Sequence, residues 1–327
     1  MPECEVVLDT GAVCIGDTVC GKVVCSFPSD TKVREITCQL VGKEKTRIRQ
    51  KRQIHFGMNV LFEQSQILVG EDKIPTGYYE FNFSFTLPTY IPATFSGKTG
   101  WIYYYVKATV NRPYMIDYEH KVTLTVSSPR VDFNHIRENL QLSPVVYESE
   151  KRLCCCCCAS EPITLSLSLE KEAFVLGEVA KIVVKIMNMS ETSVQELELS
   201  LTKHLEFFNK ENSELTTEVK DLIAVEKASG VGPHGSRIYR INFLIPPTIN
   251  ITNLNNSTLI KRQFVLMAKA VLPSFHENFS VCTAIVLGHI PILSSQDSPV
   301  YQMDRLGIEI EDSELPYVTT TNPCVIF

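Results

Sequence analysis

Residues 79–85 read YEFNFSF, and this alternation of apolar and polar side chains decides the fold class. Three further segments repeat the pattern: KVTLTV at 121–126, TLSLSL at 164–169 and ELELSL at 196–201. A period of two is typical of strands that bury one face in a core and expose the other. No long segment carries the 3.6-residue apolar repeat of an amphipathic helix. The sequence therefore predicts an all-β protein built from β-sandwiches.

The length of 327 residues suits about two domains, and an internal repeat suggests where they lie. The segment VCIGDTVCGKV at 13–23 resembles FVLGEVAKIVV at 174–184, which aligns Gly16 with Gly177. Other segment pairs recur at a similar offset, as expected of a duplicated sandwich. We predict four parts: a sandwich at 1–128, an interdomain linker at 129–161, a second sandwich at 162–293 and a flexible acidic tail at 294–327.

Charge and cysteine content narrow the class of protein. With 31 Lys and Arg against 37 Asp and Glu, the net charge is −6, which argues against a nucleic-acid binder. The N-terminus has acidic residues where a signal peptide needs basic and then apolar ones, and no apolar run could span a membrane. We therefore expect a cytoplasmic protein whose twelve cysteines are mostly reduced thiols rather than a disulfide framework.

One stretch resembles a known family. The run IPTGYYEFNFSFTLPTYIPATFSGKTGWIYYYVKATVNRP, at 74–113, is similar to the most diagnostic part of the α-arrestin (arrestin-domain-containing) family. Three more segments resemble the family in the same order: GDTVCGKVVCSF at 16–27, KRLCCCCCASEPI at 151–163 and VLGHIPI at 286–292. The resemblance covers nearly all of residues 1–293. It implies two tandem arrestin-like (immunoglobulin-like) β-sandwich domains.

The same resemblance implies a non-catalytic adaptor in membrane-protein trafficking. Its expected partners are transmembrane cargo or receptor tails, and its expected processes are endocytosis, endosomal sorting and ubiquitin-ligase-dependent down-regulation of cargo. Two alternatives stay open: a structural sorting-coat component of retromer type that does not read phosphates, and a thiol-based redox or metal protein. His-Glu-x-x-His, Gly-x-Ser-x-Gly and phosphate-loop motifs are absent, so we predict no enzyme, no cofactor and no metal.

The segment KEKTRIRQKR, at 43–52, holds six cations and one anion. If it is a strand, alternate cations share one face, where a row of like charges favours a bound anion. Arrestin-like N-domains often carry basic phosphate-reading surfaces, so the family resemblance also favours anion binding by this row. The competing interpretation is a solvated edge strand whose cations prevent aggregation. The predicted anion or cargo ligands are Lys43, Lys45, Arg47, Arg49 and Lys51.

Five consecutive cysteines stand in the linker after Lys151 and Arg152. Adjacent thiols cannot all point toward one tetrahedral metal ion, so the run predicts no zinc site. It is interpreted either as an inert cysteine-rich linker of the kind the family has, or as a site of S-acylation, with redox sensitivity as a third alternative. The residues concerned are Cys154, Cys155, Cys156, Cys157 and Cys158.

The chain ends in Cys324, Val325, Ile326 and Phe327, which fits a Cys-aliphatic-aliphatic-X prenylation signal. The final Phe indicates geranylgeranylation, with a chance match as the alternative. One lipid chain holds a protein to membranes only reversibly, so a second signal is needed. We predict a lipid anchor at Cys324 and peripheral association with the plasma membrane or endosomes.

The family's usual tail carries Pro-Pro-x-Tyr motifs for WW-domain ubiquitin ligases, and this sequence has none. The nearest match in the tail has only Pro299 and Tyr301 at the required spacing, which makes a weak WW-like motif. This argues against direct recruitment of a WW-domain ligase.

Overall fold

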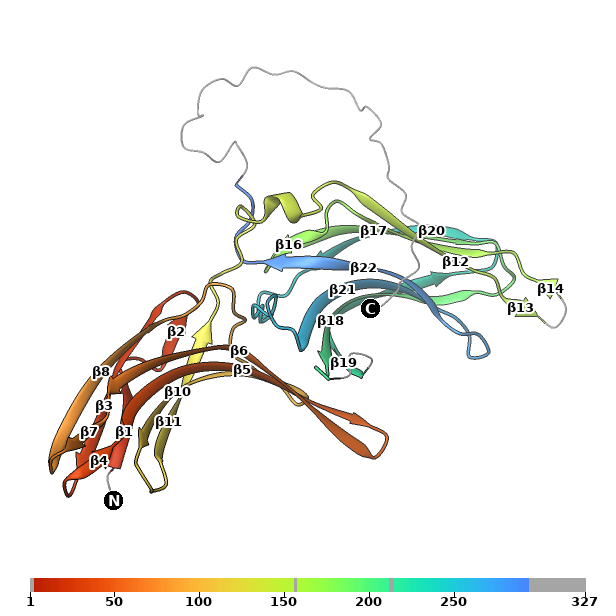
Figure 1. Ribbon diagram of the computed structural model, residues 1–327. Coiled ribbons are helices and arrows are strands. Elements are labelled where there is room, and N and C mark those ends of the chain that lie inside the picture. The colour runs from red at the N-terminus through yellow and green to blue at the C-terminus, as the bar shows by residue number, and fades with distance from the viewer. Residues whose placement is uncertain (1–2, 156–157, 212–214, 294–327) are drawn as a thin grey trace, which may run out of the picture. The chain divides into compact units, whose positions relative to one another are not determined.

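The computed structural model describes residues 3–155, 158–211 and 215–293 (Figure 1). As the alternation predicted, the regular structure in these ranges is almost entirely strand, with a single 3-10 turn, η1 (Arg137–Asn139). The tail predicted at 294–327 lies outside the described residues.

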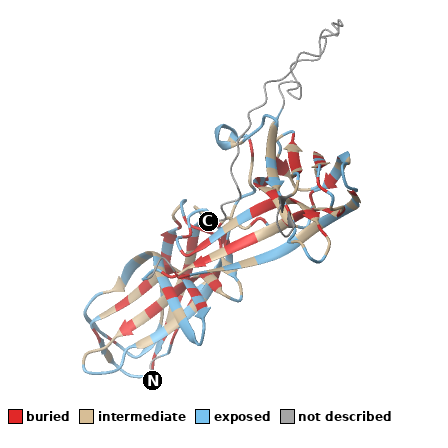
Figure 2. Cartoon of the chain, turned by 90° about the vertical axis from the view of Figure 1, so that its right-hand side faces the viewer, coloured by how far each residue is buried: buried red, intermediate tan, exposed pale blue. Residues whose placement is uncertain are grey.

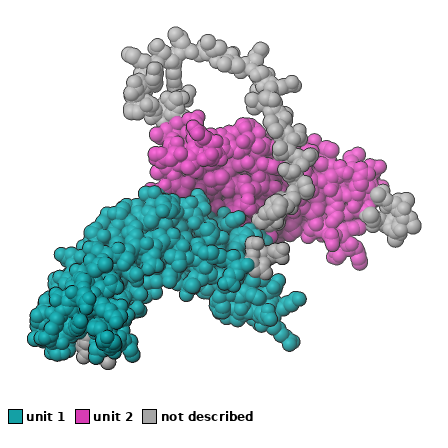
Figure 3. All heavy atoms as spheres, viewed as in Figure 1, with its two compact units in different colours: residues 1–129, 205–219, 252–262 teal, residues 130–204, 220–251, 263–327 magenta. Residues whose placement is uncertain are grey.

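The chain forms two compact units, which Figure 3 shows in different colours. Unit 1 contains Met1–Pro129, Leu205–Val219 and Thr252–Arg262. Unit 2 contains Arg130–His204, Lys220–Ile251 and Gln263–Phe327. Unit 1 therefore takes two short segments from far along the chain, and the domain boundaries expected from the repeat stay a prediction.

Unit 1 is a sandwich of a three-stranded and a six-stranded sheet. The smaller sheet has the order β1 (Glu3–Leu8), β3 (Thr18–Phe27), β8 (Gly77–Thr86). The larger has the order β2 (Ala12–Cys14), β11 (Tyr118–Ser127), β10 (Gly100–Asn111), β5 (Glu35–Gln50), β6 (Gln53–Val69), with β9 (Phe95–Ser96) also pairing with β10. A ribbon of β4 (Thr31–Val33) and β7 (Asp72–Ile74) completes the unit.

The core of unit 1 follows the sequence pattern. On β8, Phe83 and Phe85 are buried while Asn82 and Ser84 are exposed, which confirms the interpretation of YEFNFSF as a half-buried strand. Figure 2 shows the same alternation of buried and exposed residues along other strands. The two distant segments also contribute to this core, through Leu205, Phe207, Leu254, Leu259 and Ile260.

Unit 2 is a second sandwich. Its four-stranded sheet has the order β12 (Val145–Lys151), β15 (Ile163–Leu169), β17 (Val179–Asn188), β20 (Ser236–Leu244). Its five-stranded sheet has the order β16 (Ala173–Val175), β22 (Phe279–Gly288), β21 (Ile260–Val271), β18 (Val194–Phe208), β19 (Thr216–Val231). One end of β21, of β18 and of β19 belongs to unit 1. A small ribbon joins β13 (Cys154–Cys155) to β14 (Cys158–Ala159). The leucines of TLSLSL and ELELSL lie in the core of unit 2, as their period predicted.

The internal repeat is visible as one turn built twice. Gly16 and Gly177 both adopt a positive φ, +87° and +84°, in the left-handed region that favours glycine. The carboxylate of the next residue accepts a hydrogen bond from a backbone N–H three positions earlier in each copy, 2.8 Å at Asp17 and 2.9 Å at Glu178. The short strand before each turn pairs in parallel with the last strand of its sheet. The sequence repeat is thus a structural repeat.

The thiols were expected to be mostly reduced, and Cys4 and Cys25 of unit 1 depart from this expectation because they form a disulfide. They lie directly opposite each other on β1 and β3, and both are buried. Opposed residues on adjacent antiparallel strands point to the same face, which brings the two sulfur atoms together. The sequence did not reveal that these two strands are neighbours. Cys14, Cys20 and Cys38 are free thiols.

Candidate functional site

The basic segment forms the second half of β5, and its side chains alternate as predicted. Lys45, Arg47 and Arg49 are exposed and Lys43 is half-buried, whereas the intervening residues are buried. Lys51 falls outside the strand: it has φ 53° in the turn between β5 and β6. Four of the five predicted cations therefore share one face of β5, and the fifth stands at the tip of the hairpin.

Aromatic rings of β10 lie beside these cations. Lys43 pairs with Tyr103 in the sheet register, and Lys45 pairs with Trp101. The rings of Tyr103 and Tyr105 stack with their centroids 6.2 Å apart. Lys43 Nζ lies 5.9 Å from the Tyr105 centroid, and Lys45 Nζ lies 5.5 Å from that of Tyr103. Such contacts between cations and ring faces hold lysines in place without neutralising their charge.

Two further lysines complete the cluster, and sequence reasoning missed both. Lys107 on β10 lies directly opposite Lys121 on β11. Lys121 Nζ is 3.4 Å from the Tyr105 centroid and 5.6 Å from that of Tyr103. Lys121 stands on KVTLTV, which was predicted to be a strand, and Lys107 lies in the run at 74–113, but the sequence does not say which strands flank β5. We name the set Lys43, Lys45, Lys107 and Lys121, around Tyr103 and Tyr105, the lysine–tyrosine cluster.

The electrostatics of the cluster favour an anion. Desolvation lowers the pKa of Lys121, Tyr103 partly opposes this shift, and the neighbouring Lys43, Lys45 and Lys107 lower the pKa further. Lys107 forms a 3.2 Å ion pair with Glu119. Within the described ranges, none of the ion pairs involves the other three lysines. Four ammonium groups thus share one paired carboxylate, and a bound phosphate or carboxylate would offset their repulsion.

The face of β5 opposite the cations makes buried polar contacts. Glu44 is fully buried, and its carboxylate accepts hydrogen bonds from the hydroxyls of Ser257 and Thr258 at 2.5 and 2.6 Å. Thr46 donates to the backbone carbonyl of Phe208 at 2.8 Å. These contacts stabilise the strand from behind, so the outward cations start from a fixed backbone.

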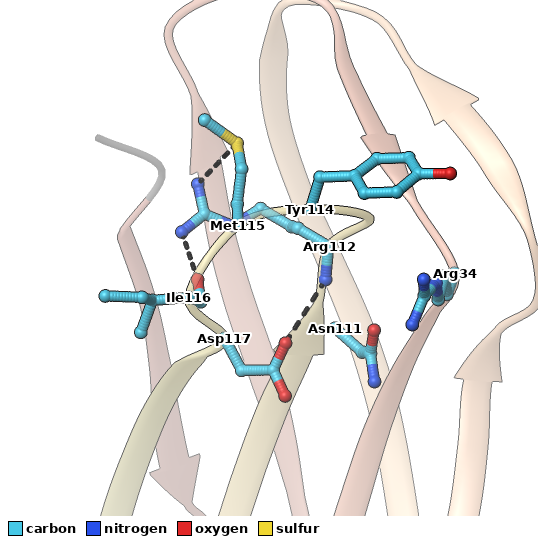
Figure 4. Close-up of a pocket in the computed structure, with 7 residues that line it drawn as sticks. All are labelled: Arg34, Asn111, Arg112, Tyr114, Met115, Ile116 and Asp117. Atoms are coloured by element: carbon cyan, nitrogen blue, oxygen red, sulfur yellow. Dashed lines mark hydrogen bonds between the residues drawn. The ribbon is translucent and has the colours of Figure 1, made fainter.

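Apart from the cluster, a hollow lies at the turn between β10 and β11, lined by Arg34, Arg112 and the residues around them (Figure 4). Arg112 is engaged within its own loop: it donates to the carbonyl of Ile116 at 2.5 Å, and its backbone N–H donates to Asp117 at 3.4 Å. This guanidinium is thus less available to an external anion than the lysines of the cluster.

Several predicted site residues stay untested. Cys154, Cys155 and Cys158 lie on the β13–β14 ribbon, whereas Cys156 and Cys157 lie outside the described residues. Cys324 and the weak WW-like motif at Pro299 and Tyr301 also lie outside them. Within the described part of the chain, no helix is both long and apolar enough to cross a membrane.

Comparison with known proteins assigns the family. Residues 4–134 match the N-terminal domain of arrestin (or S-antigen), and residues 159–292 match its C-terminal domain. The chain belongs to the arrestin-domain-containing family, the α-arrestins. The resemblance seen at residues 74–113 is thereby confirmed, and so is the expectation of two arrestin-like sandwiches. Proteins of this family are in general non-catalytic trafficking adaptors.

Relatives of this α-arrestin share moderate identity with it. It is 25% identical over 233 residues to arrestin domain-containing protein 5 of Bos taurus, an alignment that spans 70% of each protein. It is 28% identical over 198 residues to arrestin domain-containing protein 4 of Homo sapiens, spanning 55% of this chain and 46% of the human protein. Arrestin domain-containing protein 17 of Caenorhabditis elegans is 25% identical over 194 residues, and the alignment covers 45% of it. The chain thus spans about half the length of the last two.

Proposed function

We propose that this α-arrestin binds anionic or phosphorylated cargo tails through the outward face of β5, β10 and β11 in unit 1. The observation that carries the proposal is the lysine–tyrosine cluster. Three of its ammonium groups lie against two stacked rings, and the fourth, on Lys107 opposite Lys121, pairs with the carboxylate of Glu119. The proposed anion ligands are those expected from the sequence (Lys43, Lys45, Arg47, Arg49 and Lys51), together with Lys107 and Lys121.

The cellular role that fits this site is sorting of membrane cargo in endocytosis and at endosomes. A lipid on Cys324, or on the run Cys154 to Cys158, would keep the adaptor near cargo at a membrane. Intact mass and membrane fractionation of the wild type and of Cys324→Ser, both made in animal cells, test the prenyl anchor. An unmodified wild-type mass would refute it.

Any link to a ubiquitin ligase would rest on the weak motif at Pro299 and Tyr301, because the chain lacks Pro-Pro-x-Tyr. An indirect link through the cargo or another adaptor fits the sequence better.

The experiment measures binding of a labelled phosphorylated cargo peptide by fluorescence anisotropy. We expect the double variant Lys45→Glu with Lys121→Glu to raise the Kd at least about tenfold, because it turns attraction into repulsion on both sides of the tyrosines. The matched control is Lys181→Glu with Lys185→Glu, two exposed cations on β17 of unit 2 that change the net charge equally. Affinity should also fall as salt is added.

Equal affinity of the wild type and the Lys45 and Lys121 variant would refute phosphate reading at this face. That outcome, with binding to coat proteins intact, would favour the alternative of a structural sorting-coat component of retromer type. An equal loss of peptide affinity in the control variant would mean that binding depends on the net charge of the protein and not on this face.

A further inference from the structure

An apolar row runs along the outward face of β6, which sequence reasoning did not single out. The side chains of Ile54, Phe56, Met58 and Val60 are 43%, 69%, 52% and 46% exposed. Isolated apolar residues are common on protein surfaces, but four at alternate positions of one strand form a continuous strip. We name these four residues the apolar row.

The register places the apolar row beside the basic row of β5. Phe56 lies directly opposite Arg47, and Met58 lies directly opposite Lys45. Opposed residues of an antiparallel pair point to the same face, so one strip of cations and one strip of apolar side chains run in parallel. The two strands form one long hairpin (Figure 1), whose turn adds the exposed cations Lys51 and Arg52.

The opposite face of β6 is already occupied, so the apolar row cannot turn inward. A Cβ on Gly57 would lie 2.5 Å from the Thr46 hydroxyl oxygen, which shows how tightly that side is filled. Asn59 donates to the Glu44 carboxylate at 2.9 Å and accepts from Lys210 at 2.6 Å. Because side chains alternate along a strand, these contacts fix the apolar row on the outward side.

Charge decides what covers this face. Among the residues that the structure describes, no carboxylate forms an ion pair with Arg47, Arg49, Lys51 or Arg52. A phosphorylated tail would neutralise these cations but would leave the apolar row exposed to water. An anionic bilayer would contact both the cations and the apolar row. Apolar side chains can enter the boundary of the acyl chains while lysine and arginine reach the lipid phosphates.

We infer that the β5–β6 hairpin is a membrane-contact element that binds a bilayer rich in anionic lipid. Phe56 and Met58 insert at the acyl boundary, and Arg47, Arg49, Lys51 and Arg52 contact the headgroups. This inference goes beyond the proposed function, because it needs neither cargo nor a covalent lipid. Under this inference Arg47, Arg49 and Lys51, which the proposed function counts among the anion ligands, contact lipid instead. The cargo tail then binds at the lysine–tyrosine cluster alone.

The test uses the full chain made in bacteria, where Cys324 carries no prenyl group. Sedimentation with vesicles compares phosphatidylcholine alone with phosphatidylcholine containing about 30% phosphatidylserine. We expect the wild type to prefer the anionic vesicles. Replacing Arg47 and Arg49 with Gln should lower partitioning about thirtyfold. Replacing Phe56 and Met58 with Ser, which leaves the charge unchanged, should lower it at least about tenfold.

Two matched controls should partition as the wild type does. Ile67→Ser removes an apolar side chain that is 64% exposed on the same strand but outside the apolar row. Lys181→Gln with Lys185→Gln removes two exposed cations from unit 2. Circular dichroism and the fluorescence of Trp101 establish that each variant is folded.

Three results would overturn the inference. The wild type could partition equally into neutral and anionic vesicles, or it could bind neither. The folded Phe56 and Met58 variant could also partition into anionic vesicles as strongly as the wild type does. Binding of the phosphorylated peptide separates this inference from the proposed function. We expect the Phe56 and Met58 variant to keep the wild-type peptide affinity. If it instead loses peptide binding while still sedimenting with anionic vesicles, the row belongs to the cargo site and membrane contact is rejected.

Discussion

Replacing Glu44 with alanine is expected to destabilise unit 1 by about 4 kcal/mol. The fully buried carboxylate joins β5 to the segment at 252–262. It accepts hydrogen bonds from the hydroxyls of Ser257 and Thr258, from the amide of Asn59 at 2.9 Å and from the backbone N–H of Thr258 at 3.2 Å. Alanine removes the acceptor for all of these donors at once.

The magnitude follows from the donors that cannot find another acceptor. The hydroxyls of Ser257 and Thr258 can rotate, but the backbone N–H groups of Thr258 and Leu259 cannot. Each buried donor left unpaired costs about 1–3 kcal/mol, and the missing side-chain atoms leave a cavity that adds to the loss. Glu44→Gln keeps the shape and one acceptor oxygen, so it should cost only about 1–2 kcal/mol.

The assay is urea unfolding followed by tryptophan fluorescence. Trp101 is the only tryptophan in the chain, and it lies on β10 within unit 1, directly opposite Lys45. Its transition therefore reports on the unit that contains Glu44. The control is Glu63→Ala, because Glu63 is an exposed residue of β6 and a surface change of this kind moves stability by at most about 0.5 kcal/mol. A Glu44→Ala transition that coincides with the wild type would refute the reasoning.

Two further predictions concern the repeated turn and a buried thiol. Gly16→Ala and Gly177→Ala should each destabilise the protein by about 1–2 kcal/mol, measured by calorimetry, because both positions need a positive φ. The control is Gly232→Ala, because a Cβ at that position would meet no atom within 4 Å. Equal stability of all three variants would contradict the argument. Burial raises the pKa of the Cys38 thiol to about 12. An alkylating reagent at neutral pH should therefore label the exposed Cys14 and leave Cys38 unmodified, as read by mass spectrometry. Equal labelling of Cys14 and Cys38 in the folded protein would contradict this. The raised pKa also predicts that stability falls as the pH rises from the ordinary thiol pKa of 9.0 toward 12, because the Cys38 thiol of the unfolded chain releases its proton first.

Local patterns in the sequence predicted the strands and one row of the site. The alternation in YEFNFSF matches the burial of Phe83 and Phe85, because the pleat of a strand sets that period whatever lies next to it. The same logic placed Lys45, Arg47 and Arg49 on one face. Lys51 departs from the row because the chain reverses there into the hairpin turn.

Features that depend on strand neighbours could not be predicted in this way. Lys121 joins Lys43 only because β10 lies between β5 and β11, an order set by packing of residues far apart in sequence. The Cys4–Cys25 disulfide depends in the same way on the pairing of β1 with β3. Strand order and register come from the whole sandwich, so one sequence shows which residues alternate but not which strands they meet.

The discontinuity of unit 1 has a consequence for synthesis on the ribosome. Its first part ends at Pro129, yet its last segment ends at Arg262. At about 5–20 residues per second, roughly 7–27 s separate the synthesis of Pro129 from that of Arg262. For most of that interval the nascent chain has β5 without Ser257 and Thr258. Glu44 then has water in place of its final partners. A polypeptide released early, before residue 252, would retain the strands of the first sandwich but would be a substrate for chaperones and proteases rather than a working fragment.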